Sequence, residues 1–123
     1  PLPDMRAARS TAAAAALGGD VLVVGGQGGP AGAALRSVER LVECAEAWEP
    51  GPELHLARAG ATALVFGREL FAIGGWDQVA SHRSIERLDA ARGAWHLEAL
   101  PEFAASPRLC AAVALAGLGG TLL

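Results

Sequence analysis

The sequence predicts an all-β protein made of repeated units, each a sheet of four short antiparallel strands. Three observations support this fold class. Residues 36–41 (Arg-Ser-Val-Glu-Arg-Leu) return almost unchanged as residues 83–88 (Arg-Ser-Ile-Glu-Arg-Leu), 47 residues later. An apolar run followed by a glycine pair also occurs twice, and a tryptophan returns at the same offset of 47. A period of this length is typical of solenoid or propeller repeats, in which each unit packs against its neighbours.

The first two strands of each unit are apolar runs joined by a three-residue turn that contains glycine. Two apolar runs with this spacing indicate a β-hairpin. Because the runs are continuously apolar, we expect both faces of these strands to be covered. The predicted strands are 11–17 and 21–24 in the first unit, and 61–66 and 70–73 in the second. A helix over 12–16 is the main rival, but it would be short and the flanking glycines disfavour it.

A polar, glycine-bearing loop follows each hairpin, at 27–35 and at 76–82. The third strand is then expected at 37–42 and at 84–88, where apolar and charged residues alternate. A short fourth strand carries the tryptophan of each unit. These last strands are predicted at 47–49 and 94–97.

The glycine pairs Gly25-Gly26 and Gly74-Gly75 each end a second strand. Glycine in this position permits positive φ or close packing under a neighbouring residue. We favour this structural role over a ligand-binding one, because no helix start follows to form a phosphate cradle.

In order, these markers are a double glycine, a Ser-(Val/Ile)-Glu-Arg-Leu strand, a tryptophan and a Pro-containing linker to Ala-Arg. Together they resemble the Kelch repeat, and the resemblance covers nearly the whole chain. It implies that each unit is one four-stranded blade of a β-propeller, and that the chain holds an incomplete propeller of about two and a half blades. The expected division is 1–10 for the end of a preceding repeat, 11–58 and 59–108 for two repeats, and 109–123 for a truncated further one.

The form of the repeats is most similar to that of the Kelch-like proteins. This resemblance implies a substrate adaptor that captures a protein partner for a cullin-3 ubiquitin ligase, with cullin-3 bound through a separate BTB domain. It also implies that two kinds of loop line the partner-binding face. The loop before each first strand would contribute Arg9, Ser10, Arg58 and Arg108. The loop between the second and third strands would contribute Gln27, Trp76, Asp77, Gln78 and His82.

Three arginines, Arg9, Arg58 and Arg108, precede the first strand of successive units. A ring of guanidinium groups suits carboxylate or phosphate groups of an acidic partner. The alternative is structural, with these arginines capping carbonyl groups or pairing with Glu53 or Glu102.

The remaining repeated residues have a structural interpretation. Trp48 and Trp95 are expected to wedge between adjacent units, since a buried tryptophan contributes a large apolar area. Glu39 and Glu86 alternate with arginines on a strand. We expect each to pair with an arginine or a backbone amide, because acid–base catalysis would need a second group in a cleft.

Composition excludes several function classes. The net charge is −3 and all ten basic residues are arginine, so no basic surface for nucleic acid is expected. Two cysteines do not form a disulfide framework, and the first residues lack a secretory signal, so a cytoplasmic location is expected. The longest nonpolar stretch, 109–123, is too short for a membrane helix. Three histidines show no metal-ligand spacing, so neither a metal nor a cofactor is expected.

We therefore expect a protein-interaction module and not an enzyme. An actin- or cytoskeleton-binding Kelch protein is one alternative, and a segment of a Kelch-type enzyme such as a sialic-acid mutarotase is another. The copper site of galactose-oxidase relatives includes tyrosine, and the chain has none. Because propellers need closure, we also expect the 123 residues alone to be unstable or prone to aggregation.

Overall fold

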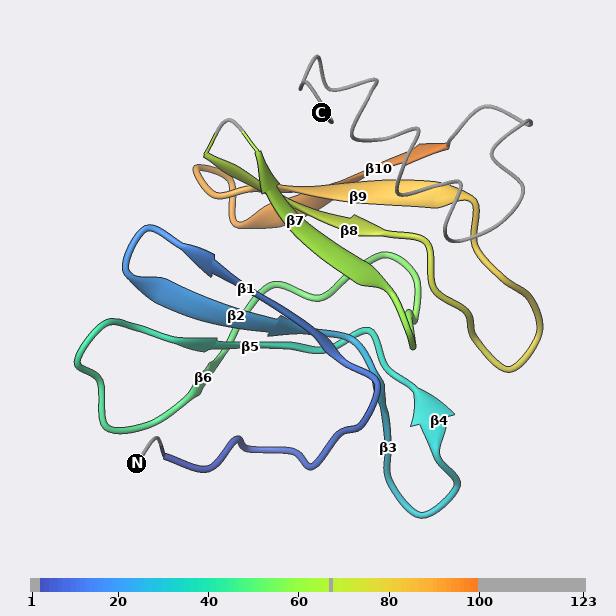
Figure 1. The fold of residues 1–123 in the computed structure, drawn as a ribbon, viewed down its shortest axis with the longest axis horizontal. Coiled ribbons are helices and arrows are strands. Elements are labelled where there is room, and N and C mark those ends of the chain that lie inside the picture. The colour runs from blue at the N-terminus through green and yellow to red at the C-terminus, as the bar shows by residue number, and fades with distance from the viewer. Residues whose placement is uncertain (1–2, 67, 100–123) are drawn as a thin grey trace, which may run out of the picture.

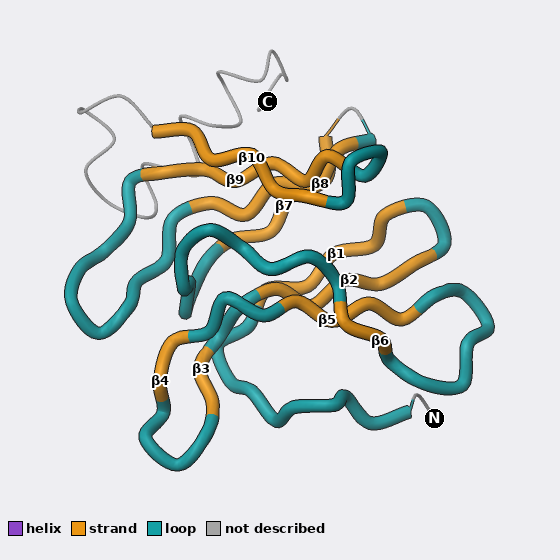
Figure 2. The backbone as a smooth tube through the Cα atoms, turned by 180° about the vertical axis from the view of Figure 1, so that it is seen from behind, coloured by secondary structure: helices purple, strands orange, loops and turns teal. Residues whose placement is uncertain are grey.

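The computed structural model describes residues 3–66 and 68–99, and within them the secondary structure is entirely β. Two four-stranded antiparallel sheets lie side by side, and a small hairpin projects from the first (Figures 1 and 2). The fold class predicted from the sequence, with repeated sheets of four antiparallel strands, is therefore confirmed.

The first sheet has the strand order β1-β2-β5-β6. Its strands are β1 (Ala13–Leu17), β2 (Asp20–Val24), β5 (Val38–Leu41) and β6 (Glu49–Pro50). Leu17 pairs with Asp20, so the turn between β1 and β2 holds two residues and not the three predicted. Gly18 adopts a φ of 65° there, a conformation that glycine reaches without a steric cost.

The second sheet repeats this order as β7-β8-β9-β10. Its strands are β7 (Thr62–Phe66), β8 (Glu69–Ile73), β9 (Ser84–Asp89) and β10 (Ala94–Ala99). The first strands of the two sheets, β1 and β7, contact each other, whereas β6 and β10 form the opposite edges. Residues 51–61, called the linker below, join the sheets.

The core lies between the two sheets. The first sheet contributes Leu22, Val24 and Val38, each no more than 2% exposed. The second sheet contributes Leu70, Ala72, Leu88 and Trp95, and the linker inserts the fully buried Leu54. Burying a leucine contributes about 1.5–3 kcal/mol, so the stability of either sheet depends on the presence of the other.

Three further expectations need correction. The loop predicted at 27–35 contains a further hairpin, β3 (Gln27–Gly28) with β4 (Ala33–Ala34). The fourth strand of the first sheet is Glu49–Pro50 and not 47–49. In β1 the burial alternates, so its continuous apolarity does not mean coverage on both faces; Ala14 and Ala16 are exposed.

Candidate functional site

Glu39, on β5, holds the chain that precedes the first sheet. Its carboxylate accepts hydrogen bonds from the backbone N–H groups of Arg6 at 2.6 Å and Ala7 at 3.0 Å. One of its oxygens also accepts a bond from Nη2 of Arg9 at 2.9 Å, and both side chains are almost fully buried. The repeated glutamate is therefore an attachment point for the preceding segment.

Glu86, on β9, holds the linker in the same way. It accepts hydrogen bonds from the backbone N–H groups of His55 and Leu56. Nε of Arg58 donates to Oε2 of Glu86 at 2.9 Å, and neither of these two side chains is exposed. The offset of 47 in the sequence thus corresponds to one contact pattern built twice.

The rest of each guanidinium group caps the chain next to the glycine pair. Arg58 donates to the carbonyl oxygens of Gly74 at 2.7 Å and Ser84 at 3.1 Å, and to the Ser84 hydroxyl at 2.7 Å. Arg9 makes the equivalent bonds to Gly25 and Ser37. Serine therefore belongs to the network, a role that its recurrence in the repeat could have indicated.

The charge of Arg58 is stabilised by the carboxylate of Glu86. Burial lowers the pKa of the Arg58 guanidinium, whereas the hydrogen bond to Glu86 and the charge of that carboxylate raise it. Because the charged form is stable in this buried position only beside a carboxylate, the two residues act as a unit.

These contacts correct the prediction that Arg9 and Arg58 face a partner. Their guanidinium groups point inward, and the carbonyl-capping alternative describes both residues. The carboxylates they pair with are Glu39 and Glu86 and not Glu53 or Glu102. Arg108, and the truncated repeat expected at 109–123, lie outside the described residues.

The glycine pairs lie where the chain crosses the linker. Gly25 has a φ of 64°, and a Cβ atom there would lie 2.3 Å from the carbonyl oxygen of Arg58. Gly75 has a φ of 88°, and a Cβ atom would lie 2.9 Å from the carbonyl oxygen of Ala59. The neighbouring glycines, Gly26 and Gly74, also have positive φ. Both requirements, positive φ and close approach, explain the repeated pair.

Each repeated tryptophan is tied to the segment that precedes its sheet. Nε1 of Trp48 donates to the carbonyl oxygen of Pro3, and Nε1 of Trp95 donates to that of Pro52, both at 2.8 Å. Trp95 belongs to the core between the two sheets, as expected for a wedge. Trp48 packs on Val23 and Leu41 beside the N-terminal segment.

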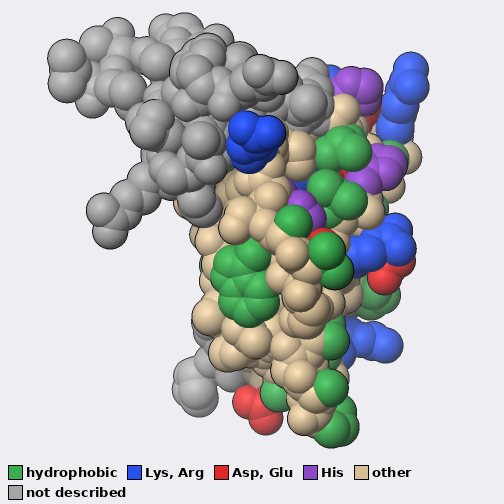
Figure 3. Space-filling model, turned by 90° about the vertical axis from the view of Figure 1, so that its right-hand side faces the viewer, with side chains coloured by type: hydrophobic (Ala, Val, Ile, Leu, Met, Phe, Trp, Pro, Cys, Tyr) green, Lys and Arg blue, Asp and Glu red, His purple; other side chains and the backbone are tan. Residues whose placement is uncertain are grey.

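The remaining predicted site residues gather at one edge of the two sheets, formed by residues 8–12, 25–37, 57–61 and 74–83. We call it the loop edge, and it faces the viewer in Figure 3. Ser10 and Gln27 exchange two backbone hydrogen bonds there, of 2.9 and 2.8 Å. A hollow of about 360 Å³ opens beside them, lined by Ala8, Arg9, Ser10, Gln27, Gly28 and Gly29.

Trp76, Asp77 and His82 shape the loop of the second sheet. Trp76 exchanges two backbone hydrogen bonds of 2.9 Å with Ala59 of the linker. His82 reaches back with Nε2, 2.7 Å from the carbonyl oxygen of Ala57. Its Nε2 also lies 3.6 Å from the Asp77 carboxylate. The loop is thus fastened to the linker at both of its ends.

The tip of this loop is held by Asp77. Its Oδ1 accepts hydrogen bonds from the backbone N–H groups of Val79 at 2.7 Å and Ala80 at 2.9 Å. These two bonds lower the pKa of the Asp77 carboxyl, since they favour its ionised form. The result is a compact turn that presents Val79 to solvent, with 92% of its surface exposed.

Gln78 joins the loops of the two sheets. Its Oε1 accepts a hydrogen bond from the backbone N–H of Ala34 at 3.2 Å, and its Nε2 donates to the carbonyl oxygen of Gly32 at 3.4 Å. The β3–β4 hairpin and the 74–83 loop therefore form one surface. Sequence reasoning missed Val79 as part of this surface, because a single apolar residue in a loop is not by itself a sign of a binding site.

Neither a metal cluster nor a membrane-spanning helix is found in the part of the chain that the structure describes. Residues 3–66 and 68–99 contain no group of three or more His, Cys, Asp or Glu side chains that could hold a metal ion. The same part of the chain has no helix with the length and apolar character needed to cross a membrane.

Comparison with known proteins agrees with the repeated architecture. A family model described as the Kelch motif matches residues 8–55 and again residues 57–99. The comparison with curated proteins found no significant match. The two matched stretches together span most of the chain, and each includes one complete four-stranded sheet.

Proposed function

Because the chain belongs to the Kelch-repeat family, whose repeats generally mediate protein–protein interaction, we propose that its loop edge binds a protein partner. We further propose that the full-length protein is a BTB-Kelch adaptor that presents this partner to a cullin-3 ubiquitin ligase. In this proposal the protein acts in the cytoplasm, has no enzymatic activity of its own and contacts cullin-3 through other domains.

The observation that carries the binding proposal is the construction of the loop edge. The loops of both sheets are fastened by backbone hydrogen bonds and by the Gln78 amide, so they keep one shape. A preorganised surface loses less conformational freedom on binding than a mobile one. On this surface the exposed Val79 supplies an apolar contact, and Ser10 and Gln27 supply hydrogen-bonding groups beside a hollow.

The chemistry of the partner follows from the same surface. The guanidinium groups of Arg9 and Arg58 are used inside the sheets, so the expected preference for an acidic partner loses its support from these two residues. A partner that offers an apolar side chain and backbone hydrogen-bonding groups fits the described edge better. Support for the adaptor role comes from the Ser-(Val/Ile)-Glu-Arg-Leu form of the repeats.

Co-immunoprecipitation with the full-length protein tests both proposals, partner binding at the loop edge and the cullin-3 adaptor role. Val79→Asp and Ser10→Glu change exposed side chains of the loop edge, whereas Arg92→Ala changes an exposed side chain in the β9–β10 turn at the other end of the strands. We expect the first two variants to lose partner proteins that the wild type and Arg92→Ala retain. All variants should still capture cullin-3, because cullin-3 binds elsewhere in this proposal.

The outcomes distinguish the binding role of the loop edge from the adaptor role. Unchanged partner recovery in Val79→Asp and Ser10→Glu would remove the loop edge from the binding role. Absence of cullin-3 from every precipitate would overturn the adaptor role and leave the binding role intact. Co-sedimentation with actin filaments that is lost in the same two variants would assign the cytoskeletal alternative.

A further inference from the structure

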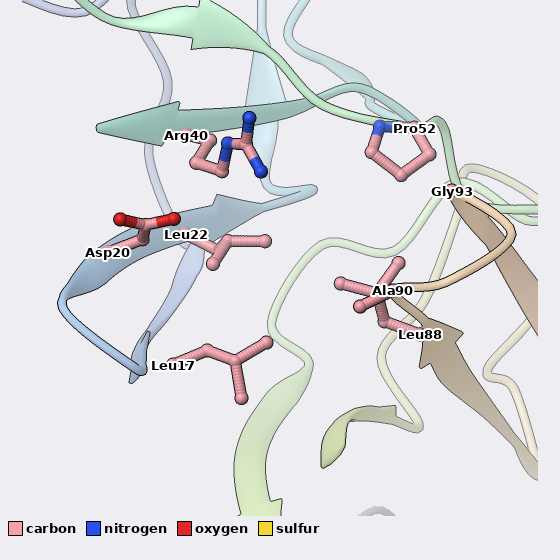
Figure 4. Close-up of a pocket in the computed structure, with 8 residues that line it drawn as sticks. All are labelled: Leu17, Asp20, Leu22, Arg40, Pro52, Leu88, Ala90 and Gly93. Atoms are coloured by element: carbon pink, nitrogen blue, oxygen red, sulfur yellow. The ribbon is translucent and has the colours of Figure 1, made fainter. Parts of the chain in front are cut away.

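A second surface feature lies at the other end of the strands, away from the loop edge. A pocket of about 170 Å³ opens between the two sheets (Figure 4). Leu17 and Asp20 flank the β1–β2 turn, while Ala90 and Gly93 lie in the β9–β10 turn. The pocket is lined by Leu17, Asp20, Leu22, Arg40, Pro52, Leu88, Ala90 and Gly93.

The pocket has an apolar floor and a polar rim. Leu22 of the first sheet and Leu88 of the second are both more than 90% buried. Figure 4 shows Leu17 and Leu22 on one side of the pocket facing Leu88 and Ala90 on the other. Asp20 and Arg40 stand on the side of the first sheet. This arrangement suits a group that is apolar at its tip and polar where it meets solvent.

Size decides the kind of ligand. Pockets for cofactors and drug-sized molecules usually measure about 300–1,000 Å³, well above the volume found here. An engineered apolar cavity of about 150 Å³ in another protein holds one benzene molecule. A volume of about 170 Å³ therefore accepts one aliphatic or small aromatic side chain, not a larger molecule.

The charged groups at the rim determine which ligand residues can flank the inserted side chain. Arg40 is already paired with Glu49, which accepts hydrogen bonds from its Nε and Nη2. Asp20 uses Oδ1 to accept a bond from the backbone N–H of Glu43 at 3.1 Å. In the neighbouring turn, Asp89 pairs with Arg92.

One positive charge, on Arg40, therefore stands beside two carboxylates, those of Asp20 and Glu49. Asp20 and Arg40 line the pocket, and Glu49 pairs with Arg40, so these groups of the first sheet carry one net negative charge. The Asp89–Arg92 pair of the second sheet adds no net charge. The rim is thus negative and complementary to a cation, and the net charge of −3 for the whole chain has the same sign.

We propose that this pocket between the sheets docks a basic peptide segment, inserting one leucine-sized side chain above Leu22 and Leu88 while a flanking lysine or arginine pairs with Asp20. The site is separate from the loop edge, so a protein could occupy both at once. The two proposals stand or fall independently.

Leucine-methyl NMR spectra of the full-length protein test this site. The probes are three five-residue peptides: Gly-Lys-Leu-Lys-Gly, the same peptide with alanine for leucine, and the same peptide with glutamate for both lysines. We expect the first to shift the methyl signals of Leu17, Leu22 and Leu88. Loss of the leucine side chain should weaken binding at least about tenfold, because its burial supplies most of the affinity. The acidic peptide should bind about threefold more weakly or worse, and added salt should reduce the difference.

Variants of the protein complete the test. Ala90 is exposed, so Ala90→Trp should fill the pocket from its rim and abolish the shifts. Asp20→Asn keeps an oxygen acceptor for the Glu43 N–H and should remove the preference for the basic peptide over the acidic one. Val79→Ser, on the loop edge, is the matched control and should leave binding unchanged.

Several outcomes would overturn the proposal. They include no shift at millimolar peptide, equal affinity for the leucine and alanine peptides, and an unchanged preference in Asp20→Asn. Self-association of the protein that disappears in Ala90→Trp would assign the pocket to a second copy of the chain and exclude the peptide. A thermal unfolding curve of each variant shows whether it is folded. If Ala90→Trp is unfolded, the peptide preference of Asp20→Asn tests the proposal by itself.

Discussion

At the scale of single residues, the buried Arg58–Glu86 pair connects several segments of the backbone. The carboxylate accepts bonds from two backbone N–H groups of the linker as well as from the arginine. The arginine in turn caps two carbonyl groups beside β8 and β9. One buried pair therefore fixes the linker, the end of β8 and the start of β9 relative to one another.

Removing the charge of Glu86 should be costly. In Glu86→Gln the Arg58 guanidinium would remain buried without its counter-charge, for which we expect a loss of about 3–5 kcal/mol in the free energy of unfolding. Denaturant unfolding of the full-length protein measures this. Glu49→Gln is the control, because the Arg40–Glu49 pair is about half exposed and should contribute less than about 1 kcal/mol. Equal losses in both variants would contradict the assigned role.

Gly25 offers a second prediction at this scale. Gly25→Ala should destabilise the protein more than Gly93→Ala, although both glycines have a φ near 65°. The added Cβ would meet the Arg58 carbonyl oxygen at 2.3 Å in the first case and open space in the second. Gly93→Ala should therefore cost about 1–2 kcal/mol, the conformational term alone. Chemical denaturation compares the two variants, and a similar loss for both would refute the close contact at Gly25.

Asp77 makes the tip of the 74–83 loop sensitive to pH. The pKa of its carboxyl is lowered in the folded protein by hydrogen bonds from the N–H groups of Ala80 and Val79. The stabilisation is therefore fully present above the unfolded pKa of about 4 and is lost as the pH falls through the lower folded value. We expect the N–H groups of Val79 and Ala80 to lose their protection from hydrogen exchange in that acidic range. In Asp77→Asn the protection should not depend on pH, and a pH-dependent loss in that variant would contradict this explanation.

At the scale of elements, the two sheets depend on the linker between them. The linker inserts Leu54 into the core and gives the Pro52 carbonyl oxygen to Trp95. Its backbone is also hydrogen-bonded to the first glycine pair, since the N–H of Gly26 donates to the carbonyl oxygen of Arg58 at 2.8 Å. The linker is thus fixed to both sheets, with Leu54, Arg58 and Ala59 buried, and is not a flexible connection.

Trp95→Ala tests this arrangement. The side chain is 3% exposed and packs in the core shared by the sheets, so we expect a loss of about 3–5 kcal/mol. Denaturant unfolding of the full-length protein provides the measurement. A loss below about 1 kcal/mol would rule out the wedge between the sheets.

The sequence allowed prediction of most strands because apolar runs, turns and the repeat all indicate the same pairing. It did not reveal the β3–β4 hairpin, since its two-residue strands have no periodic pattern to detect. The sequence also did not show whether the Arg9 and Arg58 side chains point outward or inward, because a repeated arginine can bind a partner or cap a backbone carbonyl group equally well. Burial decides between these roles, and burial depends on how the linker folds over the glycine pairs.

At the scale of the whole molecule, the two ends of the strands differ in chemistry. The loop edge presents the exposed Val79 among loops fastened to the linker. The opposite end presents an apolar pocket with a negative rim. We propose partner binding at each of these two places, and the general role of Kelch repeats in protein–protein interaction supports binding without assigning it to one end.

Hydrogen–deuterium exchange on the full-length protein, with and without the partner recovered by co-immunoprecipitation, shows whether the loop edge binds that partner. We expect bound partner to slow exchange in residues 27–35 and 76–82, which belong to the loop edge, and to leave the β9–β10 turn unchanged. Protection confined to residues outside the loop edge would contradict this expectation.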